Sequence, residues 1–433
     1  MEEVTYKYSK YNIELESDTE GNEDEVTIFN TYTSKYVTLD KEVVEDLKGE
    51  TDISLGDFPD YLVDLGLFVP STLDEFKRVY DENKMYKQIS NSLEFVIAGT
   101  SNCPYNCIYC FEQNYLNKRS DMSIETQKET IEFIKRECEK RESLDNVFFQ
   151  LFGGEPCLSV DVFEKIIGDL KSYFNEKGIK FASRIVTNGY LLTSELTDRL
   201  KETCNLISCQ ITLDGSQDAY ERLKRPPKGA FNKVIENIKA IQDKIQIDIR
   251  LNVYDNVEDL KELISYLANL NININIYYSD VRNFDNSPND YKQIYEKYLE
   301  SDATLDAFIR SNNYTNLFKI HYCHKGLRKC VGCGANTNNY FVIDAEGNLY
   351  KCLDNIFNPS YVVGNVSEGL INESAEDIYL NRYYKEECKE LCQMFPICSG
   401  YCTAETVSLP TANVCDVRRK LLKRQIQRYM GFC

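Results

Sequence analysis

The sequence predicts an α/β fold whose centre is a series of six strand and helix units between residues 93 and 281. Short β-branched or aromatic runs alternate there with helix-length amphipathic segments such as Ser123 to Lys140 and Asp161 to Lys177. This alternation is typical of βα units that build a parallel sheet. Six units are fewer than the eight of a full (β/α)8 barrel, so we expect an incomplete, splayed barrel or an open doubly wound sheet.

Both of these folds place the functional site at the C-terminal ends of the strands. The strands are expected at Glu94 to Ala98, Val147 to Phe152, Arg184 to Thr187, Ile207 to Leu213, Gln246 to Val253 and Ile272 to Ser279. A helical stretch from Asp290 to Arg310 follows them. Ten of the 17 cysteines come after it, which predicts a separate, metal-rich C-terminal region.

The N-terminal fifth of the chain is a distinct region by charge. Residues 1 to 90 contain 22 Asp and Glu against 9 Lys and Arg, a net charge of -13 out of -19 for the whole chain, and no Cys. We expect a small α/β recognition module here, although an ordinary acidic surface beside an enzyme core is equally compatible with the charge. Its elements are expected at Val26 to Asn30 (strand), and at Asp40 to Lys48 and Pro59 to Leu67 (helices), followed by the amphipathic stretch Leu73 to Asn83.

Composition excludes several classes of function. A net charge of -19 argues against nucleic acid or an anionic membrane as the main partner, and the apolar runs are too short to span a membrane. The N-terminus lacks the apolar segment of a secretory signal, so we expect a reducing, cytoplasmic compartment. Cysteines in such a compartment more often bind metal than form disulfides. Only two His, His321 and His324, are present, which disfavours His-based metal sites and hydrolytic triads.

Three cysteines follow the first expected strand directly. Cys103, Cys107 and Cys110 have the spacing C-x3-C-x2-C on one short loop. Iron-sulfur clusters are usually held by four Cys thiolates, so three ligands would leave one iron of a four-iron cube open to another ligand. The alternative is a zinc site, which prefers C-x2-C pairs with a fourth Cys or His nearby.

This loop resembles that of the radical S-adenosylmethionine (SAM) superfamily, and the resemblance extends over most of the chain. It implies a partial (β/α)6 barrel. It also implies that SAM chelates the open iron and is cleaved to a 5'-deoxyadenosyl radical, so that the cofactors supply the radical and the protein positions it.

Further segments resemble cofactor-binding motifs of this superfamily. Gly153-Gly154-Glu155-Pro156 matches the GGEP motif that binds the methionine amino group, and Arg250 is suited to pair with the methionine carboxylate. The other residues that the resemblance assigns to SAM are Tyr109 in the cysteine loop, Asn188 in a Thr-Asn-Gly segment, and Thr212 and Asp214 at the ribose. The alternatives are tight turns at Glu155 and Asn188 and an internal salt bridge at Arg250.

The C-terminal cysteines resemble a SPASM domain, which binds two auxiliary [4Fe-4S] clusters. The resemblance assigns one cluster to Cys333, Cys352 and Cys402, and the other to Cys388, Cys392, Cys398 and Cys415. Three residues separate Cys388 from Cys392 where the family has two. The first cluster needs a fourth ligand, for which we prefer Cys330 over Cys323. If neither binds, that cluster has an open iron. A pair of zinc ribbons is the alternative.

The resemblance implies a maturase of ribosomally synthesised peptides with three domains. These are an N-terminal leader-recognition domain with a winged-helix-like fold (1 to 88), the barrel (89 to 310) and the SPASM domain (311 to 433). We expect a precursor peptide with a leader as substrate, and ferredoxin or flavodoxin as electron donor. The expected product is a thioether crosslink, as in sactipeptides or ranthipeptides, with carbon-carbon or carbon-oxygen links next. No catalytic base is assigned.

Two other functions compete with this prediction. An anaerobic sulfatase-maturing enzyme, which makes formylglycine, carries an Asp directly after the cysteine that corresponds to Cys352. Here that position is Leu353, and Asp354 comes one residue later. The other competitor is a non-catalytic iron-sulfur protein that binds a partner or transfers electrons.

Overall fold

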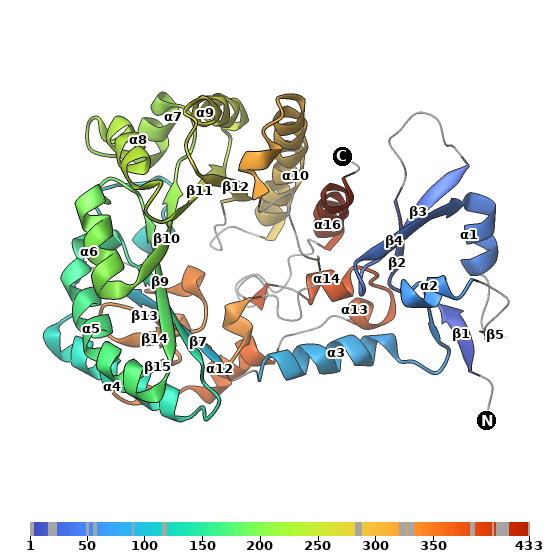
Figure 1. Ribbon diagram of the computed structural model, residues 1–433, viewed down its shortest axis with the longest axis horizontal. Helices are drawn as coiled ribbons and strands as arrows, with labels where there is room; N and C mark the ends of the chain where they lie inside the picture. Colours follow the sequence, from blue (N-terminus) through green and yellow to red (C-terminus); the bar gives the residue numbers. More distant parts are fainter. Residues whose placement is uncertain are drawn as a thin grey trace.

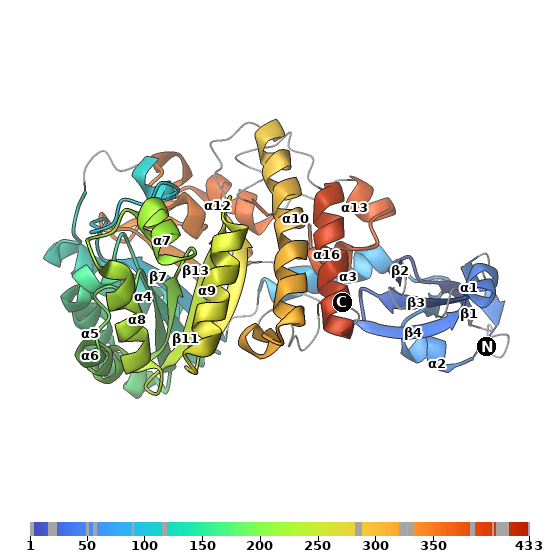
Figure 2. The ribbon, with the colours of Figure 1, turned by 90° about the horizontal axis from the view of Figure 1, so that it is seen from above.

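The computed structural model has a barrel at one end and a small β-rich module at the other (Figure 1). It describes residues 4–15, 24–48, 52–54, 59–88, 91–114, 119–281, 288–319, 327, 333–381, 386–400, 402–403 and 415–431. Helices α3, α10 and α16 lie between the two ends (Figure 2). Among the described helices, none is long and apolar enough to cross a membrane.

The barrel consists of six parallel strands paired in chain order, as the sequence predicts. The first and last strands do not pair with each other, so the sheet is an open, partial barrel. Next to the first strand lie four C-terminal strands, the first of which pairs in parallel with it. The ten strands are β7 (Ser92–Ala98), β8 (Asn146–Phe152), β9 (Lys180–Thr187), β10 (Leu206–Thr212), β11 (Gln246–Val253), β12 (Asn275–Asp280), β13 (Tyr340–Ile343), β14 (Asn348–Tyr350), β15 (Gly364–Asn365) and β16 (Gly369–Leu370).

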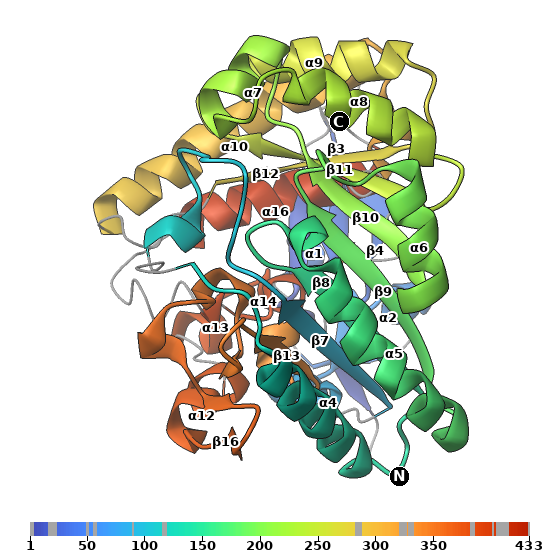
Figure 3. The same cartoon turned by 90° about the vertical axis from the view of Figure 1, so that its left-hand side faces the viewer.

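Helices cover the outer face of this sheet (Figure 3). They are α4 (Ile124–Glu139), α5 (Val160–Lys177), α6 (Ser194–Cys204), α7 (Gln217–Lys224), α8 (Ala230–Ile241) and α9 (Val257–Asn269). In α5, Phe163, Ile166, Ile167, Leu170 and Phe174 are fully buried, and this spacing forms the apolar stripe of an amphipathic helix. Since the helices occupy the outside, polar side chains on the inner face of the strands remain available for a site.

The N-terminal module contains more strand than the sequence predicts. It has two antiparallel three-stranded sheets, with strand orders β5-β1-β6 and β2-β3-β4. Only β3 and the helical segments are expected from the sequence, because the other strands are two to six residues long and their apolar residues give no clear period. The elements are β1 (Thr5–Tyr8), β2 (Asn12–Leu15), β3 (Glu25–Asn30), β4 (Lys35–Asp40), α1 (Lys41–Lys48), β5 (Ile53–Ser54), α2 (Tyr61–Asp64), β6 (Phe68–Pro70) and α3 (Glu75–Tyr86).

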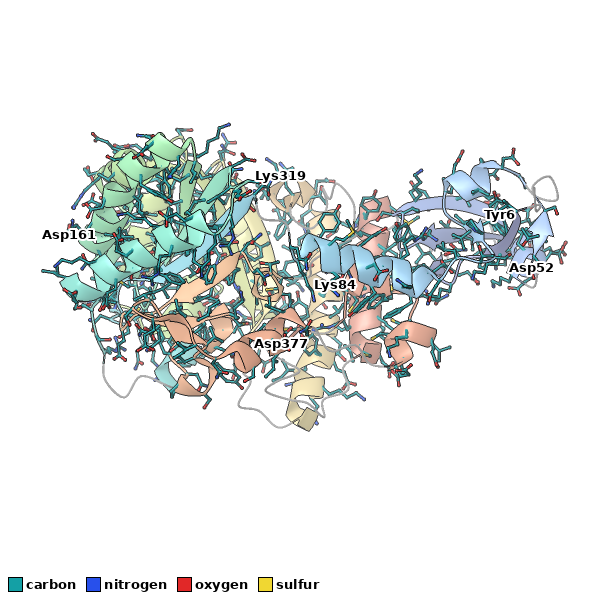
Figure 4. All side chains as sticks on the ribbon, turned by 90° about the horizontal axis from the view of Figure 1, so that it is seen from below. Tyr6, Asp52, Lys84, Asp161, Lys319 and Asp377 are labelled. Carbon is teal, nitrogen blue, oxygen red and sulfur yellow. The ribbon has the colours of Figure 1, made fainter. Side chains whose placement is uncertain are left out.

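In the described residues, the module packs against the C-terminal region. Ile13, Leu15 and Phe29 share an apolar cluster with Met394 and Ile397. In Figure 4, Tyr6 and Asp52 mark the outer end of the module and Lys84 lies on α3, which extends toward the barrel. The module and the C-terminal region therefore form a continuous packed unit.

The C-terminal region consists of short helices and turns followed by one long helix, α16, which lies beside α10. Its elements, with α10 and the short 3-10 helices of the whole chain, are α10 (Pro288–Ser311), α12 (Glu373–Leu380), α13 (Glu386–Glu390), α14 (Phe395–Cys398), α16 (Cys415–Met430), η1 (Phe111–Asn114), η2 (Pro156–Leu158), η3 (Thr315–Leu317), η4 (Gly334–Asn336), η5 (Leu353–Asn355) and η6 (Pro359–Tyr361).

A buried ionic contact joins α16 to α10. The Arg428 guanidinium lies 2.7 Å from Asp302 Oδ2 and 2.8 Å from Asp306 Oδ1. Arg428 and Asp302 are each less than 5 % exposed. Because α16 begins at Cys415, this contact also fixes the helix that carries the last of the C-terminal cysteines of the SPASM pattern.

We predict that Arg428→Ala lowers the free energy of unfolding by about 3 kcal/mol, because it leaves buried carboxylates short of a cation. Urea denaturation of the anaerobically reconstituted protein measures this change. Lys420→Ala, at an exposed position on the same helix, is the control and should change stability by less than about 0.5 kcal/mol. Equal effects of the two substitutions would contradict the assigned role of Arg428.

Candidate active site

A cavity of about 680 Å³ lies at the C-terminal ends of the barrel strands. Its wall combines the cysteine loop after β7 with inward-facing residues of β8 to β12, and a segment of the C-terminal region closes one side. Of the residues that the sequence assigns to the radical site, Cys103, Cys107, Cys110, Tyr109, Gly153, Gly154, Asn188, Thr212 and Arg250 line this cavity. The cavity therefore lies at the edge of the sheet where the parallel strands predict a site.

Backbone hydrogen bonds hold the cysteine loop in place. The Asn106 and Ile108 amides donate to the Lys224 and Leu223 carbonyls at the end of α7, at 3.2 and 2.9 Å. Burial raises the pKa of the Cys103 thiol to about 12 and also raises that of Cys107. Thiolates at these positions therefore require positive charge nearby, which iron supplies.

The two glycines of the GGEP segment lie directly against the chain that leads into Cys103. Gly153 has a φ of +132°, and a Cβ there would lie 2.3 Å from the Thr100 carbonyl oxygen. A Cβ on Gly154 would lie 2.5 Å from the Asn102 carbonyl oxygen. Only glycine permits this approach, so both residues fix the cysteine loop relative to β8.

Glu155 lies behind the cavity wall and is fully buried. Its carboxylate accepts hydrogen bonds from Thr187 Oγ1 (2.6 Å), the Asn188 amide (2.9 Å) and the Cys157 amide (3.1 Å). The resemblance to the GGEP motif predicts this carboxylate at a ligand ammonium group. In the structure it holds the segment that presents Asn188 to the cavity, and its role at the ligand stays a prediction.

Asp214 also lies behind the wall, whereas Thr212 lines the cavity. Tyr109 donates a hydrogen bond to its carboxylate, the Asn252 amide donates another at 3.2 Å, and Lys224 Nζ lies 3.7 Å away. The resemblance assigns both residues to the ribose, and strand alternation that continued to Asp214 would place them on one face. Because β10 ends at Thr212, the alternation does not continue to Asp214.

Several other cavity residues belong to no motif that marks them in the sequence. Gln150, Arg184 and Gln210 lie on the inner faces of β8, β9 and β10, and Lys224 and Glu112 also line the cavity. Alternation along the strands is the signal that would have found the first three. Burial raises the pKa of Glu112 to about 7, although the Arg119 charge opposes this shift.

Arg250 has no salt-bridge partner in the described part of the chain, although an internal salt bridge is the alternative that the sequence leaves open. Its Nε donates to Asn252 Oδ1 at 2.9 Å. The guanidinium lines the cavity and so remains available to a ligand carboxylate.

One set of C-terminal cysteines lines a second pocket. Cys388, Cys392, Cys398 and Cys415 all contribute to it, together with Arg418 and Arg419. Cys388 lies in α13, and the helical turn continues through a hydrogen bond from the Leu391 amide to the Glu387 carbonyl. Three intervening residues therefore place Cys388 and Cys392 on the same face of one turn, which explains the unusual spacing.

The other set, Cys333, Cys352 and Cys402, also comes together. Burial raises the pKa of the Cys352 thiol, and the negative charges of Asp354, Cys402 and Cys333 raise it further. Asn336 Nδ2 donates to the Tyr379 carbonyl (2.6 Å) and to Thr403 Oγ1 (2.7 Å). Asn355 Nδ2 donates to Tyr379 Oη at 2.7 Å, so this network connects the segments that carry the three cysteines. Cys323 and Cys330 lie outside the described residues.

No three or more His, Cys, Asp or Glu side chains within the described ranges are arranged to hold a single metal ion. A four-iron cube makes a different demand, because each thiolate binds a different iron.

The cavity lies in a radical SAM domain. The family model described as the radical SAM superfamily matches residues 97–267, which contain the cysteine loop, the GGEP segment and most of the barrel. Enzymes of this superfamily use SAM and a [4Fe-4S] cluster.

Characterised relatives are similar over most of the chain. A cysteine-type anaerobic sulfatase-maturating enzyme of Clostridium novyi is 25% identical over 72% of this chain and 88% of its own length. The radical SAM cyclopropyl synthase TigE of Paramaledivibacter caminithermalis is 24% identical over 77% of this chain and 73% of its own. The structure of native anSMEcpe with bound AdoMet has the same fold, with a TM-score of 0.62 and 19% identity over 78% of this chain and 98% of that one.

We predict that Gly153→Ala weakens SAM binding at least about tenfold, because the strained backbone position costs about 1–3 kcal/mol and displaces the cysteine loop. Isothermal titration of the reconstituted protein with SAM measures the affinity. Gly168→Ala is the matched control, since a Cβ there meets nothing within 4 Å in the middle of α5. It should leave the affinity unchanged and stabilise the helix by up to about 1 kcal/mol. An unchanged affinity in Gly153→Ala would contradict this role of the glycine.

Proposed function

We propose that this enzyme is a maturase that installs a crosslink, a thioether in the first instance, in a ribosomally synthesised precursor peptide. One observation carries the proposal. Leu353, Asp354 and Asn355, which follow Cys352 directly, line the same cavity as the Cys103 loop. The radical site and the segment that directly follows Cys352 thus border a shared space, in which a peptide residue can lie.

For the radical site, we assign Cys103, Cys107 and Cys110 to a [4Fe-4S] cluster. SAM contacts are assigned to the backbone of Gly153 and Gly154 and to Tyr109, Asn188, Thr212 and Arg250, with Glu155 and Asp214 acting through their neighbours. When bound, cluster and SAM supply a 5'-deoxyadenosyl radical. The chain would hold the cofactor at the ends of the strands, in the cavity that these residues line.

For the auxiliary clusters, we assign Cys333, Cys352 and Cys402 to the first and Cys388, Cys392, Cys398 and Cys415 to the second. The fourth ligand of the first cluster is Cys330 in our proposal, with Cys323 or an open iron as alternatives. An open iron would bind a substrate thiolate directly. The gathering of four cysteines around one pocket supports the second assignment.

For the leader, we assign the N-terminal module. In the sheet β2-β3-β4, the described residues leave β4 paired on one side only, and Lys35, Tyr36, Thr38 and Asp40 along it are exposed. An extended peptide can add to such an edge through backbone hydrogen bonds. A structure of similar fold, native anSMEcpe, contains a bound peptide, Cp18Cys.

A second candidate function is the oxidation of a sulfatase Cys or Ser to formylglycine. The position of Asp354 favours this function, because its carboxylate lines the cavity. Asp354 lies one residue after the position at which the sulfatase-maturing family carries its Asp. The similarity to the C. novyi enzyme points the same way. Leu353, at the position where that family carries Asp, favours the crosslinking maturase.

Two auxiliary clusters and the radical-site cluster together make three four-iron cubes, so we predict an iron content of about twelve per chain. Cys388→Ala should lower it to about eight, because one cube loses a ligand. Cys138→Ala is the control, since Cys138 is a buried thiol of α4 with no assigned role, and it should retain about twelve. Iron analysis of anaerobically reconstituted protein measures both. Four iron or fewer in the wild type would refute the auxiliary clusters, and an unchanged content in Cys388→Ala would refute that ligand.

The function is tested by coexpression with a precursor peptide encoded beside this chain, followed by mass spectrometry. We expect a loss of two hydrogens per crosslink, formation of 5'-deoxyadenosine with dithionite, and no change of either kind with Cys103→Ala. Conversion of a cysteine to formylglycine instead replaces the thiol sulfur by an aldehyde oxygen, and this mass would establish the second candidate. Removing the leader from the same precursor should reduce modification, and an undiminished yield would refute leader recognition.

A further inference from the structure

Arg184 is a cation inside the barrel that neither the fold nor the proposed cofactor contacts explain. It lies on the inner face of β9 and lines the cavity, four residues before Asn188. Its Nη2 donates to Gln210 Oε1 at 3.0 Å. Within the described residues no carboxylate lies within 4.0 Å of it, and its nitrogens are not among the buried atoms without a partner. Its remaining N–H groups therefore face the cavity.

Two amide side chains complete a group of donors around Arg184. Gln150 is opposite Arg184 in the β8–β9 register and lines the cavity. Gln210 Oε1 accepts from Tyr277 Oη at 2.6 Å as well as from Arg184, so its oxygen is occupied. Among the described contacts, Gln210 Nε2 has no acceptor, and this N–H group remains for a ligand. Three neighbouring strands thus present donors to one place.

The carboxylates near this group, Asp248 and Glu94, do not line the cavity. Asp248 accepts from Gln246 Nε2 (3.0 Å) and Asn275 Nδ2 (3.1 Å). Glu94 on β7 is influenced by the charge of Arg184, but burial raises its pKa and it does not line the cavity. Arg250 is the other guanidinium in the cavity, and SAM offers one carboxylate. Assigning that carboxylate to Arg250 leaves Arg184 without an anion.

We propose that Arg184, with Gln150 and Gln210, binds a carboxylate of the peptide substrate, so that the enzyme selects an acidic residue or a free C-terminus at the reaction site. The proposal rests on the function proposed above and names its substrate class. A guanidinium recognises a carboxylate through two parallel hydrogen bonds, and a carboxamide of the same shape cannot match this charge. Arg184 is thereby a specificity-determining residue inside the barrel.

Binding of short peptides to the reconstituted holoenzyme with SAM tests this inference. The probes are acetyl-Gly-Ala-Xaa-Ala-Gly-amide with Xaa as Asp, Glu, Asn or Gln, and the Asn peptide with a free C-terminal carboxylate. Equilibrium dialysis with mass spectrometry gives each affinity. We expect an acidic peptide to bind at least about tenfold more tightly than its amide counterpart. Preference for the Asp or Glu peptides indicates a side-chain carboxylate, and preference for the free C-terminus indicates the chain end.

Arg184→Gln should reduce the ratio of acid to amide affinity to about one, and Arg184→Lys should retain part of it because the charge remains without the planar fork. Arg199→Gln, on the outer helix α6 and paired with Glu164, is the matched control and should keep the wild-type ratio. The ratio is internal to each variant and is independent of how much protein is active.

A wild-type ratio near one, an unchanged ratio in Arg184→Gln, or no measurable binding by any probe would overturn the inference. So would a loss of SAM affinity in Arg184→Gln with the acid preference intact, which would assign Arg184 to the cofactor. None of these outcomes removes the proposed function, which depends on the mass change of the coexpressed precursor. If the coexpressed precursor shows no mass change, the ratio of acid to amide affinity is unaffected.

Discussion

The close approach of Gly153 and Gly154 to the chain that enters the cysteine loop is the contact on which the site depends. A side chain at either glycine would collide with the backbone of residues 100 to 102. Through this approach, the end of β8 sets the position of the three thiols, and hydrogen bonds from the loop to α7 set their height above the strands. A loop of this length has little structure of its own, so its geometry comes from the two elements that it contacts.

A layer of residues behind the cavity wall supports those that face it. Glu155 holds the backbone at Asn188, and Asp214 holds Tyr109 and the amide of Asn252. Both carboxylates are fully buried, and each is surrounded by donors, which is how a protein tolerates a buried negative charge. Glu155 and Asp214, which the family pattern associates with the cofactor, thus position neighbouring residues that line the cavity.

The N-terminal module contacts the C-terminal cysteine region directly. Tyr11 of the module is fully buried in one apolar cluster with Cys388 and Phe395, and Gln393 Nε2 donates to the Asn12 carbonyl at 2.6 Å. In our proposal the leader binds the module and the second auxiliary cluster lies beside it. Ordering of the module by a peptide would therefore act on the same packed unit that holds this cluster.

The sequence by itself determined the six βα units, the cysteine spacing and the positions of the motifs at strand ends, because these follow from local periodicity and from residues close together in the chain. Strand limits such as Gln246 to Val253 agree with β11. Only the tertiary structure decided that Glu155 and Asp214 lie behind the wall, that Arg184 faces an open cavity, and that the short strands of the module pair as two sheets. These features depend on which distant segments meet, such as Lys224 with Asp214 or Asn12 with Gln393, and side-chain periodicity along one segment contains no information about that choice.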